Sequence, residues 1–248
     1  MSVSKRTRLD QLLVNRKFFA TRSRAADAIK RGHVAIDGIA AEKPGQRVDD
    51  ASDIIISDPA LKYVSRAALK LLSALDHFDV DVSGAITADI GASTGGFSQV
   101  LLERSAARIY AVDVGHHQLA QSLRDASQVI SMEGLNARDI TKTHIPDALD
   151  VIVCDVSFIS LKLALPPVLG LAAANAHLIT LVKPQFEVGR NNLGKGGIVR
   201  DDELRQKAVG DIATWLTEDM KWRVSGHMPS PVSGSDGNEE FLLHAIKP

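Results

Sequence analysis

The run Asp-Ile-Gly-Ala-Ser-Thr-Gly-Gly-Phe at positions 89–97 constrains the fold of this chain more than any other segment. A short β-type run over residues 86–90 leads into the glycines, and a helix-type run over 97–103 follows them. A strand, a glycine turn and a helix in that order direct backbone N–H groups of the helix N-terminus towards a ligand. The pattern is neither Gly-x-Gly-x-x-Gly nor a P-loop, because no Lys-Ser/Thr pair follows the glycines. By itself it predicts either a ligand-binding turn or a plain turn.

An acidic residue ends the next expected strand. The run over residues 108–113 is β-type and closes on Asp113, 22 positions after Gly91. In doubly wound folds, an acid about 20 residues beyond the glycine turn binds the two hydroxyls of a ribose. Asp113 could instead cap a helix that starts near His116. The turn and the acid occur together, which favours ribose binding and predicts a cofactor that contains adenosine.

Composition and cysteine content exclude several classes of protein. The chain has 248 residues, 45% of them hydrophobic and 24% charged, which suits one large or two unequal folded domains. Its single cysteine, Cys154, rules out a disulfide framework or a cysteine-based metal site within the chain. The first residues are charged and lead into no signal-peptide core, and no apolar run reaches about 18 residues. We expect a soluble, cytoplasmic protein without stable membrane association.

Positive charge is concentrated near the N-terminus. Residues 1–31 contain nine Lys or Arg and two acids, a net charge of +7, so residues 32–248 carry −8. A basic module on an acidic body suggests binding to a polyanion such as RNA or DNA. The alternative is a helix face that is merely solvated.

The same region has the pattern of two short helices followed by a small β-hairpin-like piece. Leucines recur at helical spacing from Leu9, and Thr21 or Ser23 can cap a second helix that ends near residue 31. Strands are expected over 33–37 and 53–57.

Its segments 8–14, 21–26 and 30–38 resemble the S4-type RNA-binding domain. The resemblance, over about residues 7–57, implies docking on structured RNA mainly through shape and phosphate contacts. The residues expected to contact RNA are Arg6, Arg8, Arg22, Arg24, Lys30 and Arg31, and Arg66 further along the chain.

Strands and helices alternate through the rest of the chain. Ser65 can cap a helix over 65–75, and the closing β-type runs follow a loop rich in Pro, Ser and Gly. The remaining expected elements are strands over 108–113, 128–132, 149–154, 177–182, 222–227 and 241–246, and helices over 116–126, 159–173 (broken at Pro166-Pro167) and 202–219. This alternation predicts an α/β fold with a mostly parallel sheet, helices on both faces and an antiparallel closing pair. The expected domains are 1–60 and 65–248, joined by a linker over 61–64.

Two opposite charges end neighbouring apolar strands in the second half of the chain. Asp155 follows the run 149–154, and Lys183 follows the run 177–182. Because the carboxyl ends of parallel strands meet at one edge of a sheet, both side chains would face the crevice where the glycine turn binds its ligand. A structural ion pair is the alternative, since such charges are costly to bury unpaired. Their place at the crevice favours a functional pair.

Five motifs together resemble one group of RNA-modifying enzymes. They span residues 63–70, 89–97, 154–158, 181–187 and 237–241. With them, the half from about residue 65 is similar to the FtsJ-like ribose 2′-O-methyltransferases, and the full chain resembles the TlyA family, some of whose members are labelled hemolysins. The resemblance implies a Rossmann-like class I methyltransferase fold with a mostly parallel seven-stranded sheet. It implies methyl transfer from S-adenosylmethionine to a ribose 2′-hydroxyl of ribosomal RNA or ribosomal subunits, with cytidine as the suggested target.

The resemblance also implies a catalytic Lys-Asp-Lys-Glu tetrad, which maps onto Lys70, Asp155, Lys183 and Glu240. Glu240 is chosen over Glu239 because the family pattern is Gly-Asn-any-Glu followed by an aromatic residue. A ribose hydroxyl must lose its proton as it attacks a methyl sulfonium. Lys183 could accept that proton only when neutral, a form that a dry pocket or a neighbouring cation favours. The two acids would orient the lysines, although their charges favour the charged lysines.

The expected cofactor site combines the glycine turn, the acid and the family likeness. Asp113 would contact the ribose, and the Asn136-Ala137 pair would lie beside the adenine. The full expected set is Asp89, Gly91, Ser93, Thr94, Gly95, Gly96, Phe97, Asp113, Val114, Asn136, Ala137 and Asp155. No metal site is expected, because the adjacent His116 and His117 point apart on a helix and no third ligand is near.

The segment Gly194-Lys-Gly-Gly197 resembles a phosphate loop but lacks its Ser/Thr. We interpret it as a mobile loop near the RNA site, where Arg190, Lys195 and Arg200 could contact phosphate.

Three rival functions stay open at this point. An NAD-dependent oxidoreductase would use the same turn, but Gly-x-Gly-x-x-Gly is missing. A pore-forming cytolysin, the role that the hemolysin label implies, would need a spanning or strongly amphipathic segment, and the sequence shows neither. An RNA-binding module with an inactive methyltransferase half is disfavoured by the intact tetrad.

Overall fold

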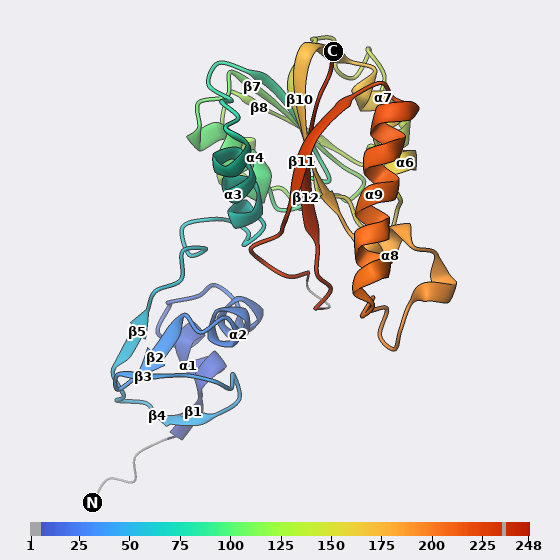
Figure 1. Cartoon of the computed structure of the whole chain (residues 1–248). Helices are drawn as coiled ribbons and strands as arrows, with labels where there is room; N and C mark the ends of the chain where they lie inside the picture. Colours follow the sequence, from blue (N-terminus) through green and yellow to red (C-terminus); the bar gives the residue numbers. More distant parts are fainter. Residues whose placement is uncertain (1–5, 235–236) are drawn as a thin grey trace, which may run out of the picture. The chain divides into compact units, whose positions relative to one another are not determined.

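The computed structural model describes residues 6–234 and 237–248. The chain divides into two compact units, residues 1–62 and 63–248, each with a hydrophobic core of its own (Figure 1). Every element of the predicted functional sites, apart from the basic N-terminal side chains, belongs to the second unit.

The N-terminal unit is a small α+β domain. Two helices pack together through Leu9 and Leu13 of the first and Ala25 and Ile29 of the second. The Thr21 hydroxyl accepts a hydrogen bond from the backbone N–H of Arg24 at 3.3 Å and so caps the second helix. Its elements are β1 (Arg6–Arg8), α1 (Leu9–Asn15), α2 (Arg22–Lys30), β2 (Val34–Ile36), β3 (Ile39–Ala40), β4 (Arg47–Asp49) and β5 (Ile54–Ile56).

The strands of this unit form two small antiparallel sheets. One pairs β1 with β4, and the other has the order β3-β2-β5. The sequence indicated β2 and β5 but not β1, β3 or β4. β1 and β4 consist mainly of charged and polar residues and β3 has only two residues, whereas β2 and β5 are apolar runs.

The second unit is built on one large sheet. Among the described residues it has seven strands in the order β11-β12-β10-β9-β6-β7-β8. Its elements are α3 (Ala68–Phe78), β6 (Ile86–Ile90), α4 (Gly96–Glu103), β7 (Arg108–Asp113), α5 (Gln121–Arg124), β8 (Val129–Glu133), η1 (Ala137–Asp139), β9 (Leu149–Cys154), α6 (Leu161–Ala164), α7 (Pro166–Leu169), β10 (Ala172–Val182), α8 (Pro184–Glu187), η2 (Arg190–Asn192), α9 (Asp202–Glu218), β11 (Arg223–Pro229) and β12 (Phe241–Ile246).

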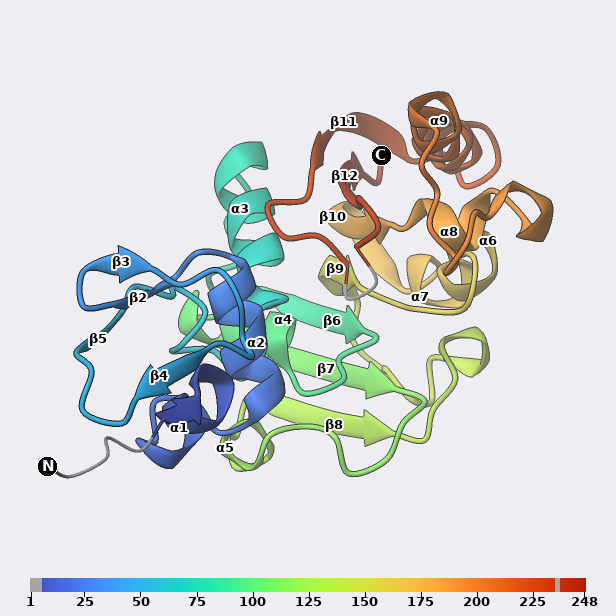
Figure 2. The same ribbon diagram turned by 90° about the horizontal axis from the view of Figure 1, so that it is seen from below.

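Strand direction in this sheet agrees with the prediction. Strands β8, β7, β6, β9 and β10 are parallel along their shared edges. Figure 2 shows β6, β7 and β8 side by side with their arrows in one direction. Strand β12 runs antiparallel to both β10 and β11, which confirms the expected closing pair.

Helices cover both faces of the sheet, as expected. Strand β9 shows why: Val151 and Val153 point into one core, with α3 and α4, while Ile152 and Cys154 point into the other, with α6, α7 and α9. A strand whose two faces are both buried is apolar throughout, which is the usual signature of a parallel sheet. Charged residues stand where the parallel strands end, at Asp113, Asp155 and Lys183.

Three of the expected helices differ from those in the structure, two of them before β8 and one after β9. Helix α3 begins at Ala68 instead of Ser65, whose hydroxyl accepts from the N–H of Ala67 just before the helix. The helix expected over 116–126 is wrong apart from α5. His117 has a φ of +56°, a left-handed conformation that an α-helix does not contain. Glu133 accepts hydrogen bonds from the backbone N–H groups of residues 117, 118 and 119, at 2.7–3.0 Å, and so stabilises this non-helical turn.

The segment expected as a helix over 159–173 is also corrected. Pro166 separates α6 from α7, as the prolines predicted, and strand β10 already begins at Ala172 instead of residue 177.

Candidate active site

The glycine turn lies between β6 and α4, where side chains would not fit. Gly91 has a φ of +84°, and a Cβ there would stand 2.8 Å from the backbone oxygen of Asp155. Gly95 has a φ of +96° and forms the N-cap of α4. An L-residue rarely adopts either conformation, so the turn needs glycine at these two positions. The close passage of β6 and β9 at Gly91 also brings Asp155 beside the turn.

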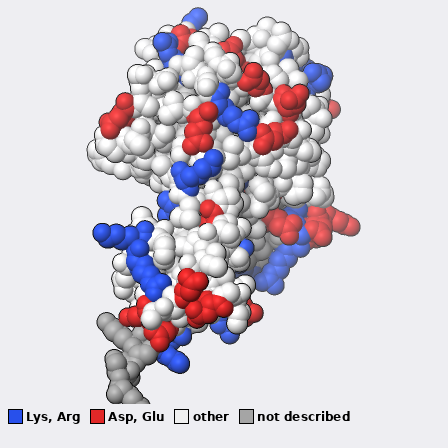
Figure 3. Space-filling view, turned by 90° about the vertical axis from the view of Figure 1, so that its left-hand side faces the viewer, with Lys and Arg blue, Asp and Glu red and all other residues white. Residues whose placement is uncertain are grey.

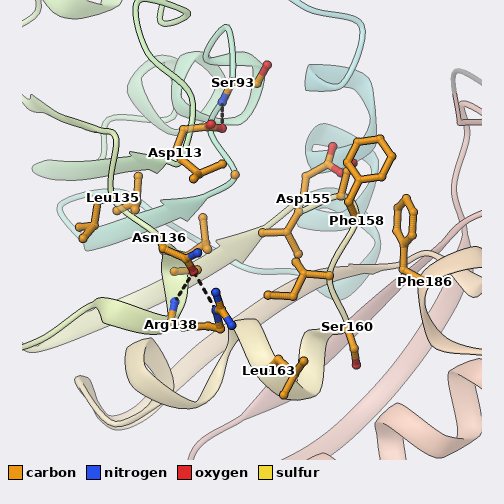
Figure 4. Close-up of a pocket in the computed structure, with 18 of the residues that line it drawn as sticks. Ser93, Asp113, Leu135, Asn136, Arg138, Asp155, Phe158, Ser160, Leu163 and Phe186 are labelled. Atoms are coloured by element: carbon orange, nitrogen blue, oxygen red, sulfur yellow. Dashed lines mark hydrogen bonds between the residues drawn. The ribbon is translucent and has the colours of Figure 1, made fainter.

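A cavity of about 870 Å³ opens at the carboxyl ends of β6, β7 and β9. Seven of the expected cofactor residues line it: Gly91, Ser93, Asp113, Val114, Asn136, Ala137 and Asp155. Figure 4 shows Asp113 and Asn136 on one side, with Asp155 and Phe158 opposite. The pocket thus has the size and place of a nucleotide-type ligand site at the strand ends of an α/β sheet.

Two polar side chains organise the wall of this cavity. The carboxylate of Asp113 accepts hydrogen bonds from the backbone N–H groups of Ser93 at 2.8 Å and Gly115 at 2.7 Å. The amide oxygen of Asn136 accepts from the backbone N–H of Arg138 at 3.0 Å. A carboxylate has about four acceptor sites, so Asp113 still has capacity for two hydroxyl groups.

A second cavity, of about 380 Å³, adjoins the first. Gly91, Ser93, Asp155, Ser157, Phe158 and Phe186 line both cavities, which therefore meet at these residues. Asp89, Thr94, Gly96 and Phe97 of the expected cofactor set line only the smaller cavity, and Gly95 lines neither. Lys70, Lys183 and Glu240 also line the smaller cavity.

The four residues of the predicted tetrad form a continuous chain of charges. Lys183 Nζ lies 2.6 Å from Asp155 Oδ1, and Lys70 Nζ lies 2.6 Å from Glu240 Oε2. Lys70 Nζ is also 3.8 Å from Asp155 Oδ2, so Asp155 stands between the two lysines. Residues from α3, the end of β9, the end of β10 and the start of β12 thus meet at one point.

Burial makes this cluster unusual. Lys70, Lys183 and Glu240 are 6%, 8% and 4% exposed. Charged side chains are almost never buried to this degree unless they are paired, and a buried pair contributes little to stability compared with apolar residues of the same size. Two cations and two anions balance each other here, at a place where an apolar cluster would have served the fold as well. This burial of four charges marks the cluster as a candidate reaction site.

The neighbouring glutamate is placed differently. The side chain of Glu239 is 63% exposed and lies 3.4 Å from Arg205, away from the lysines. The geometry supports Glu240 as the fourth member of the tetrad.

Asp89 lies fully buried beside the cluster. Its Oδ2 accepts a hydrogen bond from the Ser98 hydroxyl at 2.7 Å, whereas Oδ1 has no partner among the described residues. Burial raises the pKa of Asp89 to about 7, and the Ser98 hydrogen bond lowers it against this effect. An unpartnered buried carboxylate oxygen on the wall of the smaller cavity suits a positively charged ligand group such as an ammonium.

Two residues at the junction of the cavities were not predicted as site residues. Ser157 Oγ accepts a hydrogen bond from Lys183 Nζ at 2.8 Å. Phe158 is 89% exposed, has a φ of +66° and lies 5.2 Å, ring centre to ring centre, from Phe186. Both features are unfavourable for folding, because a left-handed backbone is strained in a non-glycine residue and an exposed aromatic ring buries no apolar surface. The sequence signal was their place two and three positions after Asp155, within the motif 154–158.

The predicted RNA-binding arginines are not equivalent in the structure. The buried Asp10 pairs with Arg8 at 3.0 Å and with Arg22 at 2.8 Å, and the hydrogen bond from Arg8 lowers the pKa of Asp10 to about 2. Both arginines remain half-exposed. Arg6 and Lys30 are exposed, and Arg66 lies at the smaller cavity. On the face of the N-terminal unit that Figure 3 shows, basic side chains (blue) and acidic side chains (red) are intermixed.

Arg31 is the exception, because it is only 19% exposed. Its guanidinium bonds both carboxylate oxygens of Asp58, at 3.0 and 2.7 Å, and Asp27 at 2.8 Å. The geometry gives Arg31 a structural part in the N-terminal unit.

No group of three or more His, Cys, Asp or Glu side chains within residues 6–234 and 237–248 could hold a metal ion. Over the same residues, no helix has the length and apolar character needed to cross a membrane.

Comparison with known proteins places both units. The model of the FtsJ-like methyltransferase family matches residues 63–247, and that of the S4 domain matches residues 7–55. A 16S/23S rRNA (cytidine-2′-O)-methyltransferase TlyA from Mycobacterium tuberculosis is 43% identical over 242 residues, which cover 97% of this chain and 90% of the relative. Hemolysin A from Brachyspira hyodysenteriae is 39% identical over 240 residues, covering 96% and 99%. A solved structure described as a hemolysin from Streptococcus thermophilus has a TM-score of 0.76 and 39% identity, covering 99% of this chain and 90% of that one.

Proposed function

Because the chain belongs to the FtsJ-like methyltransferases that carry an S4 domain, we propose that it methylates the 2′-hydroxyl of a cytidine ribose in ribosomal RNA. The observation that carries the proposal is the buried chain of Lys70, Asp155, Lys183 and Glu240 at the edge of the smaller cavity. The relatives named hemolysin and the relative named as an rRNA methyltransferase match this chain over nearly the same length, so the two names cover one family.

The two adjoining cavities together suit S-adenosylmethionine. In the larger cavity Asp113 retains acceptor sites for the ribose hydroxyls, and in the smaller one the free Oδ1 of Asp89 suits an ammonium group. When bound, this cofactor supplies an electrophilic methyl group on a sulfonium. Isothermal titration with S-adenosylmethionine and with NAD would separate the proposal from the dehydrogenase alternative.

The tetrad has to take a proton from a weak nucleophile. A ribose hydroxyl becomes reactive only as its proton leaves, and neutral Lys183 is the group whose Nζ can accept that proton. Asp155 and Ser157, at 2.6 and 2.8 Å, fix the position of Nζ. Lys70 shares the charge of Asp155 with Lys183, and Glu240 in turn holds Lys70. The rest of the rate enhancement would come from alignment of hydroxyl and methyl group between the two cavities.

The direct test uses ribosomal subunits as substrate. Purified full-length protein is incubated with them and with methyl-labelled cofactor, and the modified nucleotide is mapped. We expect label on the ribose of a cytidine. Label on a base would contradict the proposal, and so would RNA that stays unlabelled in both subunits.

Phe158→Ala is expected to lower kcat/KM for RNA by about tenfold or more. The exposed ring offers a stacking surface for the base next to the reacting ribose, and stacking on an aromatic side chain contributes about 1–3 kcal/mol per base. Phe158→Tyr keeps the ring and serves as the control. Steady-state kinetics and cofactor titration check this. A variant that loses cofactor affinity while keeping its KM for RNA would assign the ring to the cofactor site instead.

Replacement of Arg22, Arg24 and Lys30 together by Gln is expected to weaken RNA binding and to flatten its salt dependence. Each lost phosphate contact lowers the slope of log K against log salt by about 0.7–0.9, so three contacts remove about 2–3. Fluorescence anisotropy at several salt concentrations measures the slope. Arg31→Gln is the contrasting variant, because loss of its bonds to Asp58 should lower the stability of the N-terminal unit. An unchanged slope in the triple variant would refute this RNA surface.

A further inference from the structure

The segment over residues 189–200, between α8 and α9, is connected at both ends to the tetrad (Figure 1). At its start it follows α8, which begins directly after Lys183. At its end, Val199 is bound by Asn238, which lies two residues before Glu240. One end of the segment is therefore joined through α8 to Lys183. The other end is hydrogen-bonded to Asn238, two residues before Glu240.

Asn238 makes this connection through both atoms of its side-chain amide. Its Oδ1 accepts a hydrogen bond from the Val199 N–H at 3.0 Å, and its Nδ2 donates to the Gly197 carbonyl at 3.2 Å. Its own carbonyl accepts from the N–H of Gly234 at 2.9 Å. Asn238 is 2% exposed, so each bond is made in a dry environment where its loss is costly. Only an amide supplies both a donor and an acceptor in this geometry.

The segment itself carries positive charge only. Arg190, Lys195 and Arg200 are exposed, and no Asp or Glu occurs from residue 188 to residue 200. Two backbone hydrogen bonds within Gly194–Ile198 close the turn that presents Lys195, from Gly194 N–H to the Ile198 carbonyl and from Gly197 N–H to the Gly194 carbonyl, each at 3.0 Å. The phosphates of an RNA strand suit this charge, and Phe186, three residues before the segment, lines the smaller cavity.

We propose that Asn238 is a positioning residue of methyl transfer, which rests on the proposed function. It holds residues 189–200 against the stretch that carries Glu240, so RNA phosphates on the segment and the tetrad keep one fixed geometry. The same amide serves both parts, since releasing it frees the segment and loosens the backbone two residues from Glu240. Loss of Asn238 therefore weakens RNA binding and slows the reaction together.

Steady-state kinetics with ribosomal subunits test the coupling in the full-length enzyme. Asn238→Ala is expected to raise KM for RNA about tenfold and to lower kcat about tenfold, with cofactor affinity unchanged, because Asn238 lines neither cavity. Lys195→Gln should raise KM in the wild-type background and have no further effect in the Asn238→Ala background. Wild-type KM and kcat in Asn238→Ala, or additive effects in the double variant, would overturn the proposal.

Limited proteolysis tests the same connection without any activity measurement. Trypsin cleaves after Arg190, Lys195 and Arg200, so it reports opening of the segment directly. We expect cleavage there about fivefold faster or more in Asn238→Ala, intermediate in Asn238→Asp, which keeps the acceptor for Val199, and unchanged in Gln206→Ala, an exposed amide on α9. Equal cleavage of wild type, Asn238→Ala and Asn238→Asp would refute the connection. Faster cleavage, in an enzyme that leaves ribosomal RNA unmethylated, would support the connection and refute the proposed function alone.

Discussion

Lys183→Met is expected to lower the single-turnover rate of RNA methylation by at least about 10³-fold, because it removes the group that we propose as acceptor of the ribose proton. Asp155 keeps Lys70 as a partner in this variant, and Met fills a similar volume at a buried position, so the fold should persist. Lys183 does not line the larger cavity, where Asp113 would hold the ribose of the cofactor, so cofactor affinity should stay near that of the wild type.

Lys162→Met is the matched control for this experiment. Lys162 is exposed on α6 and lines neither cavity, so its loss should leave the rate unchanged. Single-turnover assays with labelled cofactor and titration calorimetry give the two quantities. A Lys183→Met enzyme that turns over at the wild-type rate would remove this lysine from the mechanism.

Glu240→Ala is expected to abolish activity and to destabilise the second unit by about 3 kcal/mol, which corresponds to a fall in Tm of about 10 °C. The ammonium of Lys70 is buried and has Glu240 as its 2.6 Å partner, and Asp155 at 3.8 Å compensates it less well. Glu240→Gln keeps a hydrogen-bond acceptor and should recover part of the stability but little activity.

The adjacent glutamate provides the control for this second experiment. Glu239 is exposed and pairs with Arg205 at 3.4 Å, so Glu239→Ala should change the free energy of unfolding by less than about 1 kcal/mol. Calorimetric melting and methylation assays on both variants distinguish the two positions. If Glu239→Ala lost activity while Glu240→Ala kept it, the tetrad would have to be reassigned.

The site was accessible from the sequence because the parallel sheet imposes strong constraints. In such a sheet the carboxyl ends of neighbouring strands must meet, so Asp155 and Lys183 had to approach each other once their strands were recognised. Lys70 and Glu240 lie outside this rule. Lys70 belongs to a helix before the sheet, and Glu240 precedes a reversed strand, so only family resemblance connected them.

Other features of the structure could not be predicted, because they depend on contacts between residues far apart in the sequence or on unusual backbone conformations. Glu133 binds the backbone of residues 117–119 in a non-helical turn from 14–16 positions away. Arg31 seemed one more exposed cation until its pairing with Asp58, 27 residues on, was visible. The left-handed backbone of Phe158 could not be predicted either, because aromatic residues rarely adopt it.

The reversed strand β12 lies between β10 and β11, although it follows both of them in the chain. During translation, β11 therefore has no neighbour to pair with until β12 has left the ribosome and entered the sheet. Lys70 can pair with Glu240 only at that same stage, because Glu240 directly precedes β12. An emerging chain can assemble the parallel strands in order, but its four clustered charged side chains come together only once β12 has entered the sheet.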